Sequence, residues 1–197
     1  FNDTATTEIY TLSLHDALPI LVGILAADSL LRVPDFRASE RNFSLLAQVS
    51  GRAGRGDMPG DVVLQTYCPE HHSIRHALTE DYHGFFAEEA KMRREALFPP
   101  FIELASFIVS GSDQQKTLGA AKELHDLFAA RPEVKEFQLF GPAPASLEKI
   151  NERYRFQLML KMPDFATLTR VTREVCRQLR KPGDTRLSID INPFFML

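Results

Sequence analysis

The sequence predicts two parts, an α/β segment over residues 21–80 and a separate α+β domain over residues 101–197. Three observations lead to this prediction. Short apolar runs alternate with an amphipathic helical pattern in the first segment, and the prolines at 99 and 100 interrupt the chain. After them the patterns follow the order βαββαβ. The chain has 197 residues, of which 44% are hydrophobic and 25% charged, enough for one or two modest globular domains.

Residues 1–20 are left out of the predicted fold. Residues 2–20 match, codon by codon, the in-frame translation of a widely used sequencing adapter. We therefore interpret 1–20 as a non-native artefact segment and expect the native chain to begin abruptly at Leu21, inside a domain. A targeting peptide is the alternative. It is disfavoured because the segment lacks a positive amino-terminal region and a continuous apolar core.

Residues 21–28 form a short apolar run that ends in Asp28. This is the pattern of a buried parallel strand whose carboxyl end opens onto a site. Asp28 is therefore a candidate nucleotide-binding residue, with capping of the next turn as the alternative. Pro34 precedes an amphipathic helix at 39–48, and residues 61–66 predict a second strand with an apolar core run.

Charged residues cluster at the start of the predicted helix. Arg37, Glu40 and Arg41 lie within five positions of one another. They predict either an ion-pair network around the helix start or a contact to DNA or to a neighbouring lobe. Arg37 is the candidate DNA-binding residue of the three.

The sequence Q-V-S-G-R-A-G-R follows the helical pattern at residues 48–55. Arg52 and Arg55 are three positions apart, so we expect both guanidinium groups on one side of the helix or its continuation. Gly51 and Gly54 leave room for a polyanion or another backbone. The planar, charged guanidinium group of arginine suits phosphate. A phosphoryl group that is being transferred needs such positive charge beside it in the transition state. The alternative is a surface turn with two solvated charges.

The pattern Q-x-x-G-R-x-x-R resembles motif VI of superfamily 2 helicases. Together with P-D-F-R-A-S-E-R at 34–41, it resembles the C-terminal third of the bacterial primosomal protein N′ (PriA) family of replication-restart DNA helicases, over residues 21–197. The resemblance implies that residues 21–80 are the C-terminal part of a RecA-like second lobe. It also implies that Arg52 and Arg55 are catalytic and reach the γ-phosphate of ATP, and that Gln48 and Gly51 help to bind the nucleotide.

No phosphate-binding loop of the form G-x-x-x-x-G-K-[ST] occurs in the sequence, and no acidic Walker B stretch follows an apolar strand. By the resemblance, ATP and Mg²⁺ would need a first lobe that this sequence lacks. We therefore expect this chain alone to be inactive as an ATPase. The zinc module of the resembling family lies upstream of the present residues, and we expect no zinc in this chain.

Cysteine and histidine usage gives no strong metal signal. Two cysteines, Cys68 and Cys176, lie far apart and indicate a reducing cytoplasm rather than a disulfide framework. Cys68, His71, His72 and His76 crowd nine positions but lack the paired C-x-x-C spacing of structural zinc sites. We predict no metal site.

Residues 81–100 predict a connecting helix that ends at a proline boundary. Tyr82, Phe85 and Phe86 belong to a helically spaced stripe that we expect to pack on a neighbour, with Glu88 and Glu89 on other faces. The prolines at 99 and 100 then end the helix, because the residue before a proline is pushed out of the α region.

Residues 101–197 predict a ferredoxin-like βαββαβ domain. The expected strands are 102–110, 134–140, 154–162 and 186–191, the expected helices are 113–130 and 164–181, and the expected proline-containing loop is 141–145. Each helical segment has an apolar face for one side of a sheet.

Basic and aromatic residues alternate after the proline-containing loop. Residues 141–181 hold nine Lys or Arg against four acidic residues, although the chain as a whole carries a formal charge of -3. Such interleaving is typical of single-strand binding surfaces. Lys149, Arg153 and Arg155 are the candidate DNA-binding residues. The arginines of the last predicted helix are equally well explained as a solvated helix face.

Taken together, the sequence and the resemblance predict a fragment of an ATP-dependent 3′–5′ DNA helicase of replication restart. The implied partners are branched and single-stranded DNA, single-stranded DNA-binding protein and other primosome proteins, in the bacterial cytoplasm and without a membrane. One alternative is a non-enzymatic nucleic-acid- or protein-binding α+β module, and another is a different superfamily 2 motor.

Overall fold

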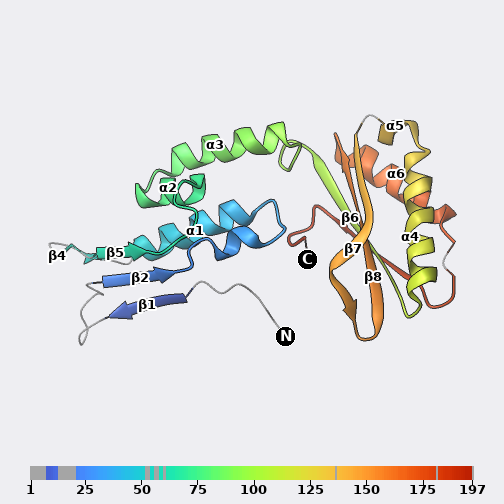
Figure 1. Ribbon diagram of the computed structural model, residues 1–197. Helices are drawn as coiled ribbons and strands as arrows, with labels where there is room; N and C mark the ends of the chain where they lie inside the picture. Colours follow the sequence, from blue (N-terminus) through green and yellow to red (C-terminus); the bar gives the residue numbers. More distant parts are fainter. Residues whose placement is uncertain are drawn as a thin grey trace. The chain divides into compact units, whose positions relative to one another are not determined.

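The computed structural model describes residues 8–12, 21–51, 54–55, 58–59, 61–135, 137–180 and 182–196, with the backbone alone at 8–12, 54–55, 58–59 and 135. Within it the chain divides into two compact units, Phe1–Met92 and Arg93–Leu197 (Figure 1). The division falls inside helix α3 (Tyr82–Glu95). The predicted domain limits at 80 and 100 lie on either side of this point.

The first unit contains a three-stranded sheet with the order β1-β2-β5. Strands β2 (Leu21–Leu25) and β5 (Asp61–Leu64) pair in parallel, which confirms the parallel strand predicted from the apolar run. Strand β1 (Glu8–Leu12) pairs antiparallel with β2 at the edge. Leaving residues 1–20 out of the fold was therefore wrong for this strand. A free sheet edge offers backbone N–H and C=O groups to any extended segment, whatever its origin.

Helices cover one face of this sheet. They are η1 (Ser29–Arg32), α1 (Ala38–Ser50), α2 (His72–Leu78) and α3, and a short two-stranded ladder joins β3 (Gly54–Arg55) to β4 (Met58–Pro59). The helix predicted at 39–48 is confirmed as α1. Its buried residues Phe43, Leu46 and Val49 pack with Val22 and Ile24 of β2 in one core.

The other face of β2 and β5 remains apolar and open. Leu21 and Leu25 are each 39% exposed and Val63 is 59% exposed. Side chains alternate between the faces of a strand, so Val63 lies opposite to the α1 side, where Val62 and Leu64 pack on the core. The expectation that Val63 belongs to a core run is wrong for this structure.

The predicted aromatic stripe of α3 is only partly confirmed. Phe85 is buried and stacks on Phe43, with ring centroids 4.2 Å apart. Tyr82 and Phe86 are 57% and 60% exposed. The helix instead buries Glu89, one turn after Phe85, because residues four positions apart share a helix face.

The second unit has the predicted element order βαββαβ, with one short helix added. Its elements are β6 (Glu103–Gly111), α4 (Gln114–Ala129), α5 (Pro132–Lys135), β7 (Gln138–Ile150), β8 (Arg153–Met162), α6 (Phe165–Gln178) and β9 (Arg186–Ile191). The sheet order is β7-β8-β6-β9, and every neighbouring pair is antiparallel. This is the split arrangement expected from the sequence, with α4 and α6 on one face (Figure 1).

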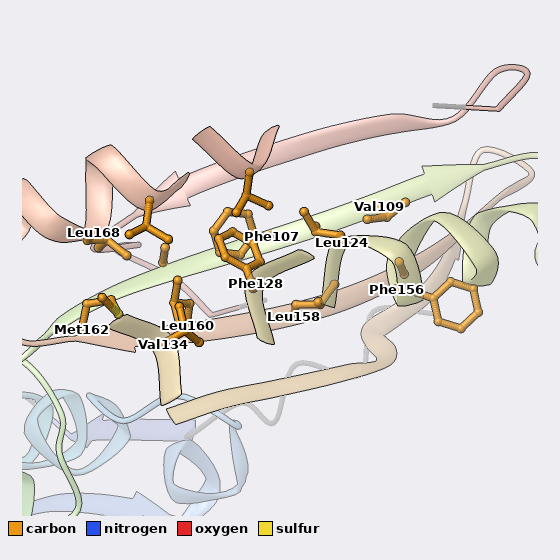
Figure 2. Close-up of a cluster of buried hydrophobic side chains, with 14 of the residues drawn as sticks. Phe107, Val109, Leu124, Phe128, Val134, Phe156, Leu158, Leu160, Met162 and Leu168 are labelled. Carbon is orange, nitrogen blue, oxygen red and sulfur yellow. The ribbon is translucent and has the colours of Figure 1, made fainter. Parts of the chain in front are cut away.

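The core of this unit fills the space between the sheet and its helices. Phe107 of β6 and Phe128 of α4 are fully buried, with ring centroids 4.9 Å apart (Figure 2). Leu158 and Leu160 of β8 face the same cluster. Carboxylates start both helices: Asp113 accepts from the Lys116 N–H at 2.9 Å and Asp164 from the Thr167 N–H at 2.8 Å.

Two predicted boundaries in this unit are wrong. The strand expected at 134–140 begins only at Gln138, because Pro132 opens the short helix α5, as proline does in a first helical turn. The expected loop at 141–145 is part of β7. Register shifts occur between Phe140 and Ala143 and after Pro144, and β7 is an edge strand, where prolines are tolerated.

Candidate nucleic-acid interface

The glycine- and arginine-rich segment begins at the end of α1. Gln48 is exposed in the last turn of the helix. Gly51 caps the helix, with its N–H 3.1 Å from the Ala47 carbonyl oxygen and with an ordinary right-handed φ of -66°. The backbone therefore does not require glycine at this position, so any need for Gly51 comes from the space that the missing side chain leaves.

Helix α1 ends at Ser50, before the two arginines in the sequence. Arg52 lies outside the described residues. Arg55 is described by its backbone alone, which forms the two-residue strand β3 and pairs with Met58. Because Arg52 lies outside the described residues and Arg55 is described without its side chain, the expectation that both guanidinium groups lie on one side of the helix or its continuation stays a prediction. The catalytic and nucleotide-binding roles of Arg52 and Arg55 stay predictions.

Asp28 joins the carboxyl ends of β2 and β5. Asp28 is 3% exposed, and its carboxylate accepts hydrogen bonds from the Thr66 hydroxyl and the Tyr67 N–H, both at 3.1 Å. Arg32 lies 3.4 Å away. Burial opposes ionisation, but the bonds from Tyr67 and Thr66 outweigh it and hold the pKa of Asp28 below its ordinary value. These bonds give Asp28 a structural role, and its side chain makes no capping hydrogen bond to η1. A nucleotide contact by Asp28 stays a prediction.

Asp28→Asn is expected to lower the free energy of unfolding by about 1–3 kcal/mol at neutral pH, because the two donors that bond to this buried carboxylate lose a charged acceptor. Since the folded pKa of Asp28 is lowered, this stabilisation is present above the unfolded pKa and is lost as pH falls through the folded value. Urea unfolding of the wild-type chain and of Asp28→Asn at about pH 7 and about pH 3 measures this loss of stability. Glu70→Gln, which replaces an exposed carboxylate, is the control. The prediction would be contradicted if the wild-type chain and Asp28→Asn differed by the same free energy of unfolding at both pH values.

Asp35 is the centre of the charged cluster before α1. Its buried carboxylate lies 3.0 Å from the Arg41 guanidinium and accepts from the Arg37 N–H at 2.9 Å. The Arg37 guanidinium packs over the Phe36 ring at 4.2 Å. This geometry fits the ion-pair alternative, and the acidic residue that organises it, Asp35, carries no distinguishing signal in the sequence. A DNA contact by Arg37 stays a prediction.

Lys149 and Arg155 lie at the β7–β8 hairpin. Lys149 pairs with Glu152, whose hydrogen bond raises the pKa of Lys149, and its ammonium lies 5.2 Å from the centre of the Tyr154 ring. Arg155 donates to the Leu147 carbonyl oxygen at 3.2 Å. Leu147 and Ile150 beside them are 56% and 39% exposed. The hairpin therefore presents cationic, aromatic and apolar groups together.

Arg153 has a different environment. It binds the Asp184 carboxylate and the Asp184 carbonyl oxygen, each at 2.6 Å, and the Ser110 carbonyl oxygen at 3.1 Å. The side chain thereby connects β8 to the end of β6 and to the turn before β9. Asp184 gave no signal in the sequence beyond its place in a Pro-Gly-Asp turn.

The arginines of α6 are partly paired. Arg170 lies 2.8 Å from Glu133 and 3.5 Å from Glu174, while Arg173 and Arg177 are exposed. This arrangement fits the solvated-face interpretation for Arg170.

The cysteine and histidine cluster is not assembled into a metal centre in the part of the chain that the structure describes. Cys68 is exposed, and His71 caps α2 by accepting from the Ser73 N–H. His72 and His76 contact carboxylates instead.

Residues 94–194 match the family model described as the Primosomal protein N C-terminal domain. The match covers the whole sheet of the second unit and its helices. The chain belongs to this family.

Curated relatives of the family extend the similarity into the first unit. The chain is 40% identical over 194 residues to the replication restart protein PriA of Synechocystis, and 36% identical over 180 residues to that of Bacillus subtilis. It is 36% identical over 177 residues to that of Treponema pallidum. These alignments cover 95%, 90% and 90% of the chain but 22%, 22% and 27% of the relatives. The chain thus spans about a quarter of their length. No described helix is long and apolar enough to cross a membrane.

Proposed function

We propose that this chain acts in replication restart, as the C-terminal part of an ATP-dependent 3′–5′ DNA helicase that recognises stalled forks and supports primosome assembly. The observation that carries the proposal is the match of residues 94–194 to the Primosomal protein N C-terminal domain. The proposed partners are branched and single-stranded DNA, single-stranded DNA-binding protein and other primosome proteins. The proposed location is the bacterial cytoplasm.

The first unit supports the assignment of residues 21–80 to a RecA-like second lobe. Parallel strands β2 and β5 are covered by helices on one face and expose Leu21, Leu25 and Val63 on the other. Parallel sheets are usually buried on both faces, so this open face fits a lobe completed by further elements. Gln48 lies in the last turn of α1, the helix that packs on the covered face, and Arg52 and Arg55 follow α1 in the sequence.

ATP binding is proposed only for a protein in which a phosphate-binding loop accompanies this chain. None of the 197 residues forms such a loop, so the chain alone is proposed to be inactive as an ATPase. Asp28 accepts from Thr66 and Tyr67 through one carboxylate oxygen, Oδ1. The proposed nucleotide contacts are those of Gln48, Gly51, Arg52, Arg55 and Asp28.

The proposed DNA contact in the second unit centres on the β7–β8 hairpin. Lys149 and Arg155 supply charge, and Tyr154 supplies a ring on which a base can stack. Their internal partners there are one exposed carboxylate and one carbonyl oxygen, which phosphates can replace. Arg153 has three such bonds to Asp184 and Ser110, so its contribution to DNA binding is proposed to be secondary to holding β8 in place.

The double variant Lys149→Ala/Arg155→Ala is expected to weaken binding to a labelled fork by about 10-fold at moderate salt, because two phosphate contacts are lost. Fluorescence anisotropy with the full chain measures this. The matched control is Arg173→Ala/Arg177→Ala, which removes the same charge from the exposed face of α6. If both variants weakened fork binding equally, binding would depend on net charge and not on the hairpin. If only the control weakened it, the DNA contact would lie on α6.

The alternative of a non-enzymatic binding module has one specific observation in its favour. The second unit has a complete antiparallel sheet and its own core. The alternatives differ in what precedes Leu21 in the gene: a P-loop and a cysteine cluster in the same reading frame support the helicase, and their absence supports the module.

A further inference from the structure

Strand β8 carries a buried lysine on the face of the sheet that lies opposite to the helices. Lys161 is 2% exposed, and its neighbour Leu160 belongs to the core between the sheet and the helices. Successive side chains of a strand point to opposite faces, so Lys161 points away from that core. Leu104, its register partner on β6, is fully buried. The outer face of the sheet is therefore covered at this point.

A buried lysine needs partners, because an isolated charge is among the least favourable groups in a protein interior. The Nζ atom of Lys161 donates to the carbonyl oxygen of Ala96 at 2.9 Å. It lies 3.8 Å from the centre of the Phe98 ring and 5.3 Å from the centre of the Phe140 ring. Burial lowers the pKa of Lys161, and no carboxylate among the described residues offsets this effect.

The acceptor of this bond lies at the carboxyl end of α3. Ala96 follows the last residue of the helix, where carbonyl groups have no partner inside the helix. Leu97 then takes a left-handed φ of 51°, and its N–H donates to the Arg94 carbonyl oxygen at 3.3 Å. The Phe98 N–H donates to the Arg93 carbonyl oxygen at 2.8 Å. This is a Schellman arrangement, in which the left-handed position is usually glycine because a side chain disfavours it.

A leucine in that position needs support from the surrounding structure, and Lys161 supplies it. Its amine bonds to a carbonyl oxygen that the two Schellman bonds do not use. Positive charge is favourable at the carboxyl end of a helix, and the faces of aromatic rings attract a cation. The bond to Ala96 needs only an N–H group, which the amine carries whether it is charged or neutral.

We propose that Lys161 is a positioning residue that fixes the carboxyl end of α3 to strands β7 and β8, so that this end is a firm joint and not a flexible linker. The contact lies within the second unit, which begins at Arg93, whereas α3 begins at Tyr82 in the first unit. Strands β7 and β8 also form the hairpin with Lys149 and Arg155. A role of the joint in holding α3 to the DNA-binding strands rests on the proposed function, but the joint itself does not.

Hydrogen exchange of the full chain tests the joint. Lys161→Met keeps the length of the side chain but removes its charge and its N–H donors. Protection of the Phe98 amide is expected to fall by about 10-fold or more, while that of the Phe107 amide in β6 changes by less than about 2-fold. Lys122→Met, at an exposed lysine of α4, is the control and should change neither amide.

Two results of this experiment would overturn the proposal. Unchanged or increased protection of the Phe98 amide in Lys161→Met would show that the lysine does not hold the end of α3. Equal losses at the Phe98 and Phe107 amides would show that it stabilises the whole unit and not the joint.

A spectrum of the wild-type chain gives a test that does not depend on the folding of a variant. Because the Lys161 ammonium lies over the Phe98 ring, we expect its Cε protons upfield of those of Lys122, with nuclear Overhauser effects to that ring. A Lys161 signal at the position of an exposed lysine, without these effects, would overturn the joint. Neither readout involves DNA, so a chain that binds no fork would contradict the proposed function and leave this test unaffected.

Discussion

Arg52→Ala is expected to abolish DNA-stimulated ATP hydrolysis, by about 10³-fold or more, in a longer protein that carries this chain together with a P-loop lobe. An arginine at the γ-phosphate stabilises charge that develops in the transition state, and alanine supplies none. Arg55→Ala is expected to act in the same direction. Steady-state ATPase assays with and without a DNA fork measure the loss.

The same variant should leave fork binding largely intact, because the proposed DNA contacts lie in the β7–β8 hairpin and not at Arg52. Arg177→Ala, an exposed arginine of α6, is the control for the loss of one positive charge. Unchanged turnover in Arg52→Ala would remove the proposed catalytic role. Loss of fork binding together with turnover would indicate a folding defect or a DNA contact at this arginine.

Phe107→Ala is expected to reduce the free energy of unfolding of the second unit by about 3–5 kcal/mol. Phe107 is fully buried between β6 and α4 and packs on Phe128, so its truncation removes a large apolar surface and leaves a cavity (Figure 2). For a unit of this size such a loss is a large fraction of the total stability. Urea unfolding, followed by circular dichroism, measures it.

Phe165→Ala is the matched control, since this phenylalanine lies in the first turn of α6 and is 56% exposed. It is expected to cost no more than about 1 kcal/mol. Equal losses for both variants would show that Phe107 is not at the centre of the core.

The regular elements were predictable because periodicity records which side of an element is buried. The run at Val22 and Ile24 gave the parallel strand β2, and the spacing of Phe43, Leu46 and Val49 gave α1. Asp113 and Asp164 marked the starts of α4 and α6. The order βαββαβ of the second unit followed from such patterns.

Features that depend on distant contacts were not predictable. The outer strand β1 came from residues set aside as non-native, and the edge position of β7 turned an expected proline loop into a strand with shifted register. Arg153 appeared as a DNA contact, but its partner Asp184 lies 31 residues away. Likewise, local spacing did not identify the partners of His72 and His76, which are carboxylates up to 17 residues away.

The candidate site, too, combines features that local sequence patterns reveal with contacts that only the structure reveals. The arginine motif and the basic hairpin were visible as local patterns, but the structure alone shows that Asp28 is satisfied by Thr66 and Tyr67. A buried carboxylate and a catalytic one look alike in sequence, because burial and partners are set by the fold.

The most direct test of a DNA-binding role is a titration of a labelled fork with the full chain across a range of salt concentrations, beside a blunt duplex of the same length. We expect the chain to prefer the fork, and we expect the logarithm of the binding constant to fall linearly with the logarithm of the salt concentration. In Lys149→Ala/Arg155→Ala the slope should be smaller by about two phosphate contacts. Absence of salt-dependent fork binding would contradict it and would leave the second unit as a protein-docking module.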